Sequence, residues 1–320
     1  MSFNCDGRRI LVTGGAGFLG SHVVPVLEGR GATVGVVRHS EHDLTRAEDC
    51  QAAVESFAPD AVVHLAAAVG GIGANREHPG SFFRDNALMG INLIEACRQA
   101  EVTKIVVVGT VCAYPSHPPV PFQEDSMWDG FPEPTNAPYG IAKRALQTML
   151  SAYRDEFGMS SAYILPANLY GPRDDFDLET SHVIPALIRK MVEARETGAD
   201  EVHLWGDGSP SREFLHVRDC AEGLALAVEK LEEPIPVNLG TGCEIRIREL
   251  AELIAETVGY TGRLRWDADM PGGQERRCLD VSRARELLGF EASIRLEKGL
   301  QETVDWHRAN RPVAAGAAAG

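Results

Sequence analysis

The chain has 320 residues, of which 44% are hydrophobic and 24% are charged, so it can bury a full core and form about two domains. Its formal net charge of -15 and its pI near 5.1 disfavour nucleic acid or an anionic membrane as the main partner. An anionic nucleotide would need local positive charge against this acidic background, and individual arginines could supply it.

The cysteines are scattered along the chain, are seven in number and include no Cys-x-x-Cys pair. This pattern disfavours a disulfide framework or a zinc site and favours a reducing compartment. The sequence opens with no charged-then-apolar leader, and it contains no run of about 18 apolar residues that could span a membrane. We therefore expect a cytoplasmic protein without a metal site, whose alanine- and glycine-rich residues 311–320 form a flexible tail.

A glycine-rich segment follows the first predicted strand. Residues 8–13 form a short apolar run, and apolar spacing typical of a helix continues from the glycines to about residue 30. Strand, glycine turn and helix in this order are typical of a dinucleotide-binding turn, because glycines let backbone N–H groups approach a pyrophosphate at the helix N-terminus. The residues predicted to bind the cofactor here are Gly14, Gly17, Phe18, Leu19 and Gly20.

The residue after the second predicted strand, residues 33–37, bears on the choice of cofactor. An NAD-binding chain commonly has an acidic residue at this place, which accepts a hydrogen bond from the ribose hydroxyl. This chain has Arg38, which could pair with a 2′-phosphate and so favours NADP(H), although an ordinary exposed arginine is also compatible. A further strand is predicted at residues 61–65, and the small side chain of Ala66 after it would let a cofactor lie close to the backbone.

Strands and helices alternate through the first half, which predicts an α/β fold with a doubly wound, Rossmann-like parallel sheet. After residue 172 the pattern changes to a smaller, mixed unit that would cap the carboxyl edge of the sheet. We expect a dinucleotide-binding domain of residues 1–172 plus a return segment near 236–260, and a substrate-binding domain of residues 173–235 and 261–310.

Four reactive side chains are clustered in the middle of the sequence. Thr110 and Cys112 follow a buried strand predicted at residues 104–108, so they would lie past its carboxyl end, where open α/β sheets bind ligands. Tyr139 and Lys143 are four residues apart and would project from one face of a helix. A nearby ammonium favours the phenolate, so this set could exchange protons with a substrate oxygen. Tyr-x-x-x-Lys alone is more often only the start of a surface helix, and the chemical interpretation depends on the preceding nucleotide fold.

Together these features resemble the extended short-chain dehydrogenase/reductase family. The resemblance includes the glycine spacing, Thr110 four residues before Tyr114, and Tyr139-x-x-x-Lys143. Within the family the chain is similar to the GDP-L-fucose synthases, which are GDP-4-keto-6-deoxymannose 3,5-epimerase-4-reductases. The similarity covers nearly the whole chain except the last ten or so residues. Its more specific stretches are residues 69–75, 112–115, 133–139, 168–172, 181–187 and 212–217.

The resemblance implies a role for each reactive residue. Cys112 and His182 would exchange protons at C3 and C5 of the sugar, where the 4-keto group stabilises an enolate. Tyr139 would protonate O4 as hydride arrives from NADPH, Lys143 would lower the pKa of that phenol and bind the nicotinamide ribose, and Thr110 would orient the carbonyl. Taken alone, Cys112 would more often be a small buried residue and His182 a capping or packing residue.

The resemblance also implies a binding site for a GDP-sugar. Arg212 and Arg277 match positions near the phosphates of the sugar nucleotide, and the Trp205 ring could stack on guanine. A core tryptophan and solvated arginines are the alternatives for these three residues. The full set of residues predicted to bind substrate is Asn168, Lys190, Trp205, Arg212 and Arg277.

Several residues depart from the family pattern. The glycine loop carries Ala16 where the family has an arginine that helps to hold the 2′-phosphate, so Arg38 would act alone. Thr110 replaces a serine but keeps the hydroxyl, and Lys190 replaces the second of two arginines.

Two other functions remain compatible with the sequence. One is an NDP-sugar epimerase that uses bound NAD(P) without net reduction. The other is a nucleotide-sensing protein on the same fold with no turnover, which predicts a broken Tyr/Lys/hydroxyl set. The resemblance further implies a homodimer formed through the two long helices after Ser81 and Pro138.

Overall fold

A parallel sheet of six strands forms the centre of the computed structural model, which describes residues 3–267 and 274–311. The strand order is β2-β1-β3-β4-β5-β9, and every neighbouring pair is parallel. The chain leaves β1 on one side and returns on its other side, so the strand order reverses between β1 and β3. The strands are β1 (Arg9–Thr13), β2 (Thr33–Val37), β3 (Ala61–His64), β4 (Lys104–Val108), β5 (Ser160–Pro166) and β9 (Pro236–Leu239).

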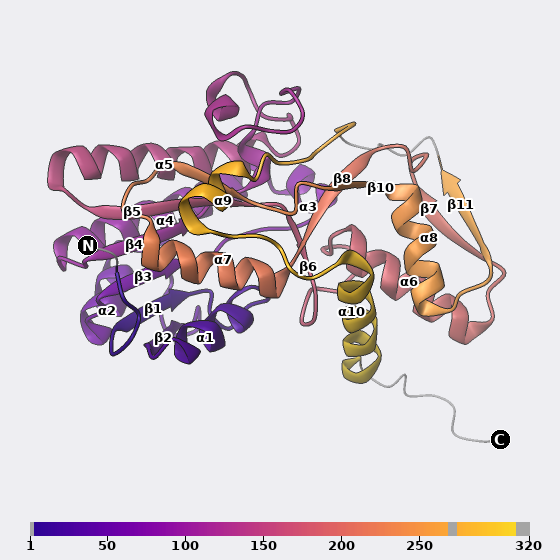
Figure 1. Ribbon diagram of the computed structural model, residues 1–320, viewed down its shortest axis with the longest axis horizontal. Coiled ribbons are helices and arrows are strands. Elements are labelled where there is room, and N and C mark those ends of the chain that lie inside the picture. Colours follow the sequence, from indigo (N-terminus) through magenta and orange to yellow (C-terminus); the bar gives the residue numbers. More distant parts are fainter. Residues whose placement is uncertain (1–2, 268–273, 312–320) are drawn as a thin grey trace.

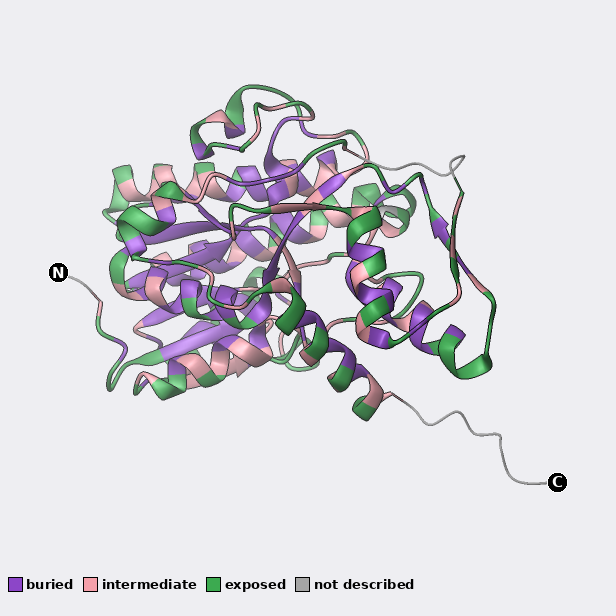
Figure 2. Cartoon of the chain, turned by 45° about the vertical axis from the view of Figure 1, so that its right-hand side comes forward, coloured by how far each residue is buried: buried purple, intermediate pink, exposed green. Residues whose placement is uncertain are grey.

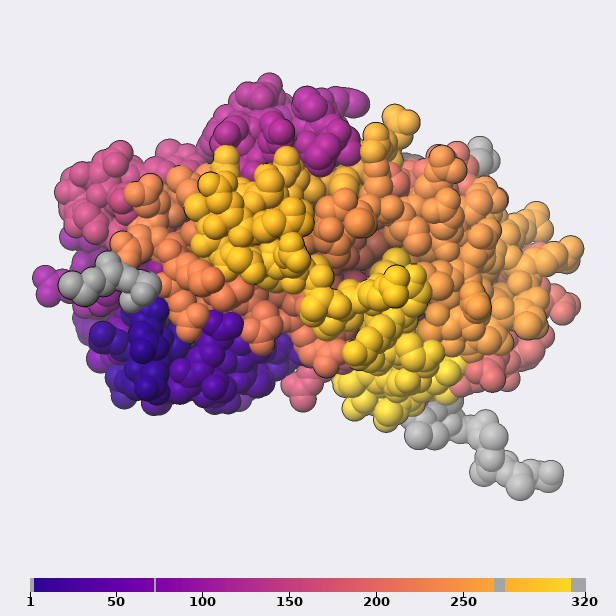
Figure 3. Space-filling model, viewed as in Figure 1, coloured from indigo at the N-terminus to yellow at the C-terminus, as the bar shows by residue number. Residues whose placement is uncertain are grey.

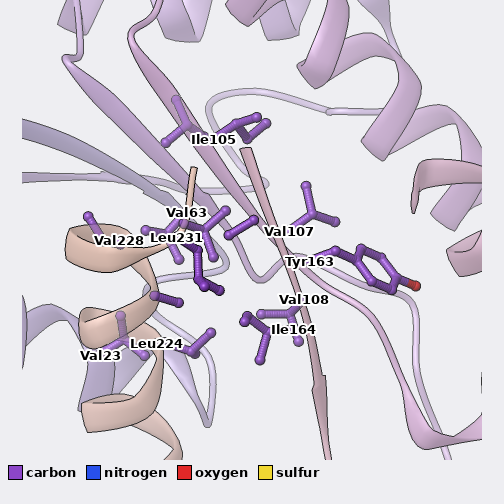
Figure 4. Close-up of a cluster of buried hydrophobic side chains, with 14 of the residues drawn as sticks. Val23, Val63, Ile105, Val107, Val108, Tyr163, Ile164, Leu224, Val228 and Leu231 are labelled. Atoms are coloured by element: carbon purple, nitrogen blue, oxygen red, sulfur yellow. The ribbon is translucent and has the colours of Figure 1, made fainter. Parts of the chain in front are cut away.

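Helices cover both faces of this sheet, because its apolar strands have two faces to bury. On one face α1 packs against α7, and α7 packs against α9; on the other α2 packs against α4, and α4 against α5. Figure 4 shows Val23 of α1 and Val228 of α7 beside strand side chains such as Val63. The doubly wound parallel sheet predicted from the sequence is therefore confirmed. The helices are α1 (Gly20–Gly29), α2 (Ala47–Phe57), α4 (Pro79–Gln99), α5 (Ala137–Phe157), α7 (Val217–Lys230) and α9 (Ser282–Leu288).

A second, smaller unit lies to the right of the sheet in Figure 1 and has its own apolar core. It contains the three-stranded sheet β10-β8-β6 and the parallel pair β11-β7. Its elements are β6 (Asn168–Tyr170), α6 (Val183–Thr197), β7 (Glu201–Trp205), β8 (Ser211–His216), β10 (Glu244–Arg246), α8 (Ile247–Val258), β11 (Arg263–Asp267) and α10 (Leu296–Asn310). In Figure 2 the strands of the main sheet are mostly coloured as buried, and the helices around them carry exposed residues on their outer faces.

The packing divides the chain differently from the expected domain boundaries. Helix α7 belongs to the segment 173–235 expected in the substrate unit, yet it packs on β4 and β5 of the main sheet. The reason is topological: β9 is parallel to β5, and a parallel connection requires a crossover element, which α7 supplies. Helix α8 lies in the expected return segment 236–260, but its apolar face packs against α6 in the second core.

Short helices connect these elements at the carboxyl end of the sheet. They are α3 (Ile72–Glu77), η1 (Val111–Ala113) and η2 (Glu124–Trp128). Of the expected tail, residues 312–320 lie outside the described residues. Within residues 3–267 and 274–311, no helix combines the length and apolar character that crossing a membrane requires.

Candidate active site

The glycine loop after β1 forms a narrow backbone cradle. Gly14 has a φ of +69°, and a Cβ there would lie 2.9 Å from the backbone nitrogen of Ala66 after β3. A Cβ on Gly20 would lie 2.2 Å from the Gly14 carbonyl oxygen, which in turn accepts a hydrogen bond from Gly17 N at 3.0 Å. Only glycine fits at positions 14 and 20, because any Cβ there would clash with the backbone. The fold brings the predicted glycines and Ala66 together at the point where the strand order reverses. A backbone this open at a helix N-terminus fits a dinucleotide.

The other predicted cofactor residues surround this cradle. Phe18 and Leu19 are half-buried at the start of α1, and Arg38 is exposed just beyond the end of β2. His64, which was not predicted as a site residue, is fully buried at the end of β3, and its Nδ1 lies 2.8 Å from the Thr13 hydroxyl. Burial and then the nearby Lys143 lower the pKa of His64 to about 3, so this imidazole is neutral.

Thr110, Cys112 and Tyr139 meet past the end of β4. The Thr110 hydroxyl accepts a hydrogen bond from Cys112 N at 3.1 Å, which caps the short helix η1. Burial raises the pKa of the Tyr139 phenol, the neighbouring Cys112 raises it further, and a hydrogen bond with Thr110 opposes both effects. The three residues, predicted from two separate stretches of the sequence, therefore form one cluster in which a hydroxyl and a thiol lie near a protonated phenol.

Gly140 explains how the helix that carries Tyr139 can approach so closely. A Cβ at this position would lie 2.4 Å from the Cys112 carbonyl oxygen, so only glycine allows α5 to pack against η1. Arg144, one turn later, donates from Nε to the Ala113 carbonyl at 2.5 Å and from Nη1 to the Gly130 carbonyl at 3.0 Å. Neither residue was predicted, because each acts through a contact that only the tertiary structure creates.

Lys143 lies on the Tyr139 side of α5, as the spacing predicts, but its ammonium is directed at the sheet. It is 2% exposed, and its Nζ donates to the Val108 carbonyl at 3.0 Å. Burial lowers the pKa of Lys143 to about 8. Thr110 is the group that lowers the pKa of Tyr139 in this structure, while the Lys143 ammonium donates to Val108, so the expected effect of Lys143 on that pKa stays a prediction.

His182 belongs to the second unit, immediately before the first residue of α6. Solvent reaches its side chain, yet the atoms packed around the ring lower its pKa, and Asp175 partly opposes that shift. The loop before it is tied to the predicted 69–75 stretch by a hydrogen bond from Gly71 N to the Thr180 carbonyl at 3.1 Å. The described contacts do not join His182 directly to Cys112 or Tyr139.

Two arginines lie beside the Cys112 thiol. Arg277 is 9% exposed, its Nη1 lies 3.8 Å from Cys112 Sγ, and Gln274 Oε1 holds its guanidinium at 3.1 and 3.2 Å. Burial lowers the pKa of Arg212 to about 10, Arg277 lowers it further, and Cys112 opposes the shift. The two positive charges therefore repel each other, and an anionic ligand group placed between them would relieve that repulsion.

Glu213 joins the backbone segments that carry these arginines. Its buried carboxylate accepts hydrogen bonds from the backbone nitrogens of Thr241, Gly242 and Leu279 at 2.5, 2.8 and 2.6 Å. Its own N–H donates to the Arg277 carbonyl at 3.0 Å. Glu213 was not predicted, although an acidic side chain directly before the apolar pair Phe214 and Leu215 of β8 is a signal that could have indicated it.

The remaining residues predicted to bind substrate are spread over the second unit. Asn168 Nδ2 donates to the Glu213 carbonyl at 2.8 Å, so it is part of the β6–β8 framework. Lys190 Nζ donates to the His203 carbonyl of β7 at 3.2 Å, and burial lowers its pKa. Trp205, at the end of β7, is 61% exposed, which excludes the alternative of a core tryptophan.

The described residues contain no group of three or more His, Cys, Asp or Glu side chains that could hold a metal ion. All seven cysteines lie within the described residues, and each is a free thiol.

Comparison with known proteins agrees with this geometry. A model of the NAD dependent epimerase/dehydratase family matches residues 10–240. The chain is 42% identical over 312 residues to a probable GDP-L-fucose synthase 1 of Oryza sativa subsp. japonica, covering 97% of this chain and 95% of the relative. It is 40% identical over 316 residues to the GDP-L-fucose synthase of Escherichia coli strain K12, with 95% and 98% covered.

A solved structure gives the same result in three dimensions. The crystal structure of a GDP-L-fucose synthetase from Naegleria fowleri bound to NADP superposes with a TM-score of 0.88 and 27% identity, covering 97% of this chain and 96% of that one. The resemblance seen in the sequence is thus confirmed, and the chain belongs to the NAD dependent epimerase/dehydratase family of extended short-chain dehydrogenases/reductases.

Proposed function

We propose that this chain catalyses the NADPH-dependent 3,5-epimerisation and 4-keto reduction of a GDP-4-keto-6-deoxy sugar, giving GDP-L-fucose or a close analogue. The observation that carries the proposal is the cluster of Thr110, Cys112 and Tyr139 beside Arg277. An intact hydroxyl, phenol and lysine set disfavours a protein that only senses nucleotides. The names of the relatives support a GDP-sugar as the substrate class and NADP as the cofactor.

NADPH would be held by the backbone of the glycine loop, with Phe18, Leu19 and Ala66 lining the cradle and Arg38 facing the 2′-phosphate. Bound there, it supplies the hydride for reduction at C4. The buried Lys143 ammonium would hydrogen-bond the nicotinamide ribose, because its pKa of about 8 leaves it mostly charged at neutral pH.

Epimerisation would use the thiol and the imidazole. The C–H bonds at C3 and C5 flank the 4-keto group, so loss of either proton gives an enolate that the carbonyl oxygen stabilises. Cys112 would exchange protons on one face of the sugar, and His182, which is contributed by the second unit, would exchange them on the other. The lowered pKa of His182 keeps the ring largely neutral at pH 7, so one nitrogen can accept a proton while the other donates.

Reduction would use the phenol as an acid. The raised pKa of Tyr139 keeps it protonated at neutral pH, so it has a proton to give to O4 as the carbonyl carbon is reduced. The Thr110 hydroxyl, which is hydrogen-bonded to the phenol, would orient the same oxygen. Lys143 acts in this scheme through the ribose and not through an ion pair with the phenolate.

The nucleotide part of the substrate would bind over the second unit. Arg212 and Arg277 would bind the diphosphate, where a guanidinium fork can contact two oxygens at once. The exposed ring of Trp205 would stack on guanine, with Asn168 and Lys190 at the edges of the site. We further propose a cytoplasmic homodimer that pairs through α4 and α5.

The test is an incubation with GDP-4-keto-6-deoxymannose and NADPH in deuterated water. We expect loss of the nicotinamide absorbance together with deuterium at C3 and C5 of the product. Deuterium without loss of NADPH would replace the proposal with an epimerase that performs no net reduction. The absence of both NADPH loss and deuterium incorporation would contradict the proposed substrate class.

A further inference from the structure

A hollow of about 340 Å³ opens beside the glycine loop, and it is lined partly by residues that have no role proposed above, among them Arg173. Its volume lies within the range of small-molecule sites, which begins at roughly 300 Å³. Arg173 is the one charged residue among the described residues that line it, in a chain with a formal net charge of -15. The lining residues are Ala16, Gly17, Phe18, Ser21, Arg173, Trp306 and Asn310.

Arg173 reaches this hollow from a tight turn after β6. Asp174 N donates to the Gly171 carbonyl at 3.3 Å, so Pro172 and Arg173 occupy the centre of the turn. Arg173 has a φ of +71°, a left-handed conformation that turns of this kind usually give to glycine. The turn is fixed to α1, because His22 Nε2 lies 2.9 Å from the Pro172 carbonyl oxygen.

The guanidinium of Arg173 is not neutralised by the protein. Within the part of the chain that the structure describes, its side chain makes no ion pair and no hydrogen bond. By contrast Arg218, which lines the neighbouring hollow, is paired with Glu302. Burial lowers the pKa of His22, the hydrogen bond with the Pro172 carbonyl opposes that shift, and the charges of Arg173 and Arg218 lower the pKa further, which places Arg173 close to the start of α1.

We propose that Arg173 binds the pyrophosphate of the nicotinamide cofactor and supplies positive charge beside a glycine loop, residues 14–20, that carries no charged side chain of its own. The inference rests on the proposed role of that loop in binding NADP(H). The pyrophosphate is favoured over the 2′-phosphate because the hollow is formed by the loop and the first turn of α1. Arg38, beyond the end of β2, does not line it. Figure 3 shows the indigo atoms of the N-terminal region and the yellow atoms of α10 close together on this face, with a few pink atoms of the middle of the chain between them.

The test compares NADPH and NADH binding by titration calorimetry in the variant Arg173→Gly. Glycine adopts a φ of +71° without strain, so the turn should persist and the thermal unfolding temperature should not fall. Loss of a charged hydrogen bond should raise both dissociation constants by the same factor, about tenfold or more. Arg173→Lys should recover part of this loss.

Two arginine variants serve as matched controls. Arg38→Ala should weaken NADPH binding and leave NADH binding unchanged, because only NADPH carries the 2′-phosphate. Arg218→Ala removes an equal charge near the same helix and should change neither constant, since that side chain is already paired with Glu302.

Three results would overturn the inference. Unchanged constants in Arg173→Gly, with a wild-type protein that binds both nucleotides, would remove Arg173 from the cofactor site while leaving the proposed function intact. A loss confined to NADPH would assign Arg173 to the 2′-phosphate. A wild-type protein that binds neither nucleotide would overturn the proposed function and this inference with it.

Discussion

Gly140 sits where the backbones of α5 and η1 touch, and its missing side chain sets the position of Tyr139. Because a Cβ would lie 2.4 Å from the Cys112 carbonyl oxygen, Gly140→Ala must push the two segments apart. We expect it to destabilise the protein by about 1–3 kcal/mol and to lower the rate of reduction. Gly80→Ala in α4 is the matched control, because nothing lies within 4 Å of the place where its Cβ would be. This variant should leave the free energy of unfolding unchanged or raise it by about 0.5–1 kcal/mol. If Gly140→Ala and Gly80→Ala changed the free energy of unfolding in urea equally, the proposed contact between α5 and η1 would be contradicted.

Lys143 gives the unfolding free energy a specific dependence on pH. Burial lowers its pKa from 10.5 to about 8, so between these two values the unfolded chain binds more protons than the folded one. The contribution of Lys143 therefore rises with pH across this window, and below pH 8 the buried charge costs its full penalty.

The variant Lys143→Met isolates that contribution. Its unfolding free energy, subtracted from that of the wild type, should give a difference that grows by about 3 kcal/mol from pH 8 to pH 10.5. Urea titrations at several pH values measure this directly. A difference that stays constant would show that the ammonium is not buried in the folded state.

For single residues, the sequence predicted reactive side chains but not the contacts that hold them in place. Thr110, Tyr139 and Lys143 could be predicted because strand ends and four-residue helical spacing are local properties. The direction of the Lys143 ammonium could not, since it depends on Val108, which is 35 residues away. Arg173 gave no sequence signal, because a left-handed backbone at an arginine is visible only in the structure.

Among the elements, β8 and the extended segment after Gln274 form the framework that holds both arginines. The Glu213 carboxylate of β8 accepts a hydrogen bond from Leu279 N in that segment and from Thr241 N and Gly242 N in the loop before β10, so its loss should loosen Arg277 more than the glycine loop. We expect Glu213→Gln to lower stability by about 1–3 kcal/mol and to raise the KM for the GDP-sugar while the NADPH dissociation constant stays unchanged. Glu275→Gln, at an exposed position on the same segment, should change neither. If Glu213→Gln weakened the binding of the GDP-sugar and of NADPH to the same degree, Glu213 would support the fold as a whole and not the arginines in particular.

Most helices and strands could be predicted from their apolar patterns, because a run such as β4, whose residues are all buried, is typical of a strand inside a parallel sheet. The sequence did not predict which of the two units each helix packs against. The amphipathic patterns of α7 and α8 show that each buries one face, but not against which sheet or helix. That choice is made by the crossover to β9 and by the packing of α6, both of which are tertiary properties.

For the whole molecule, the proposed dimer can be tested on α4. Phe83, Leu88 and Ile91 are large apolar residues that α4 leaves exposed. Ile91→Arg should convert a dimer to a monomer in sedimentation velocity, because it would bury a charge in the pairing face. Leu178→Arg, at a similarly exposed apolar position outside α4 and α5, should leave the sedimentation coefficient unchanged. A wild-type monomer would contradict the proposed assembly.

We propose that one site, built from both units, performs two reactions with separate groups: a thiol and an imidazole for epimerisation, and a phenol for reduction. The most direct test is Tyr139→Phe, incubated with GDP-4-keto-6-deoxymannose and NADPH in deuterated water. We predict that NADPH oxidation is abolished while deuterium still enters at C3 and C5, because Cys112 and His182 remain. Equal loss of both signals in a folded variant would contradict this division of roles.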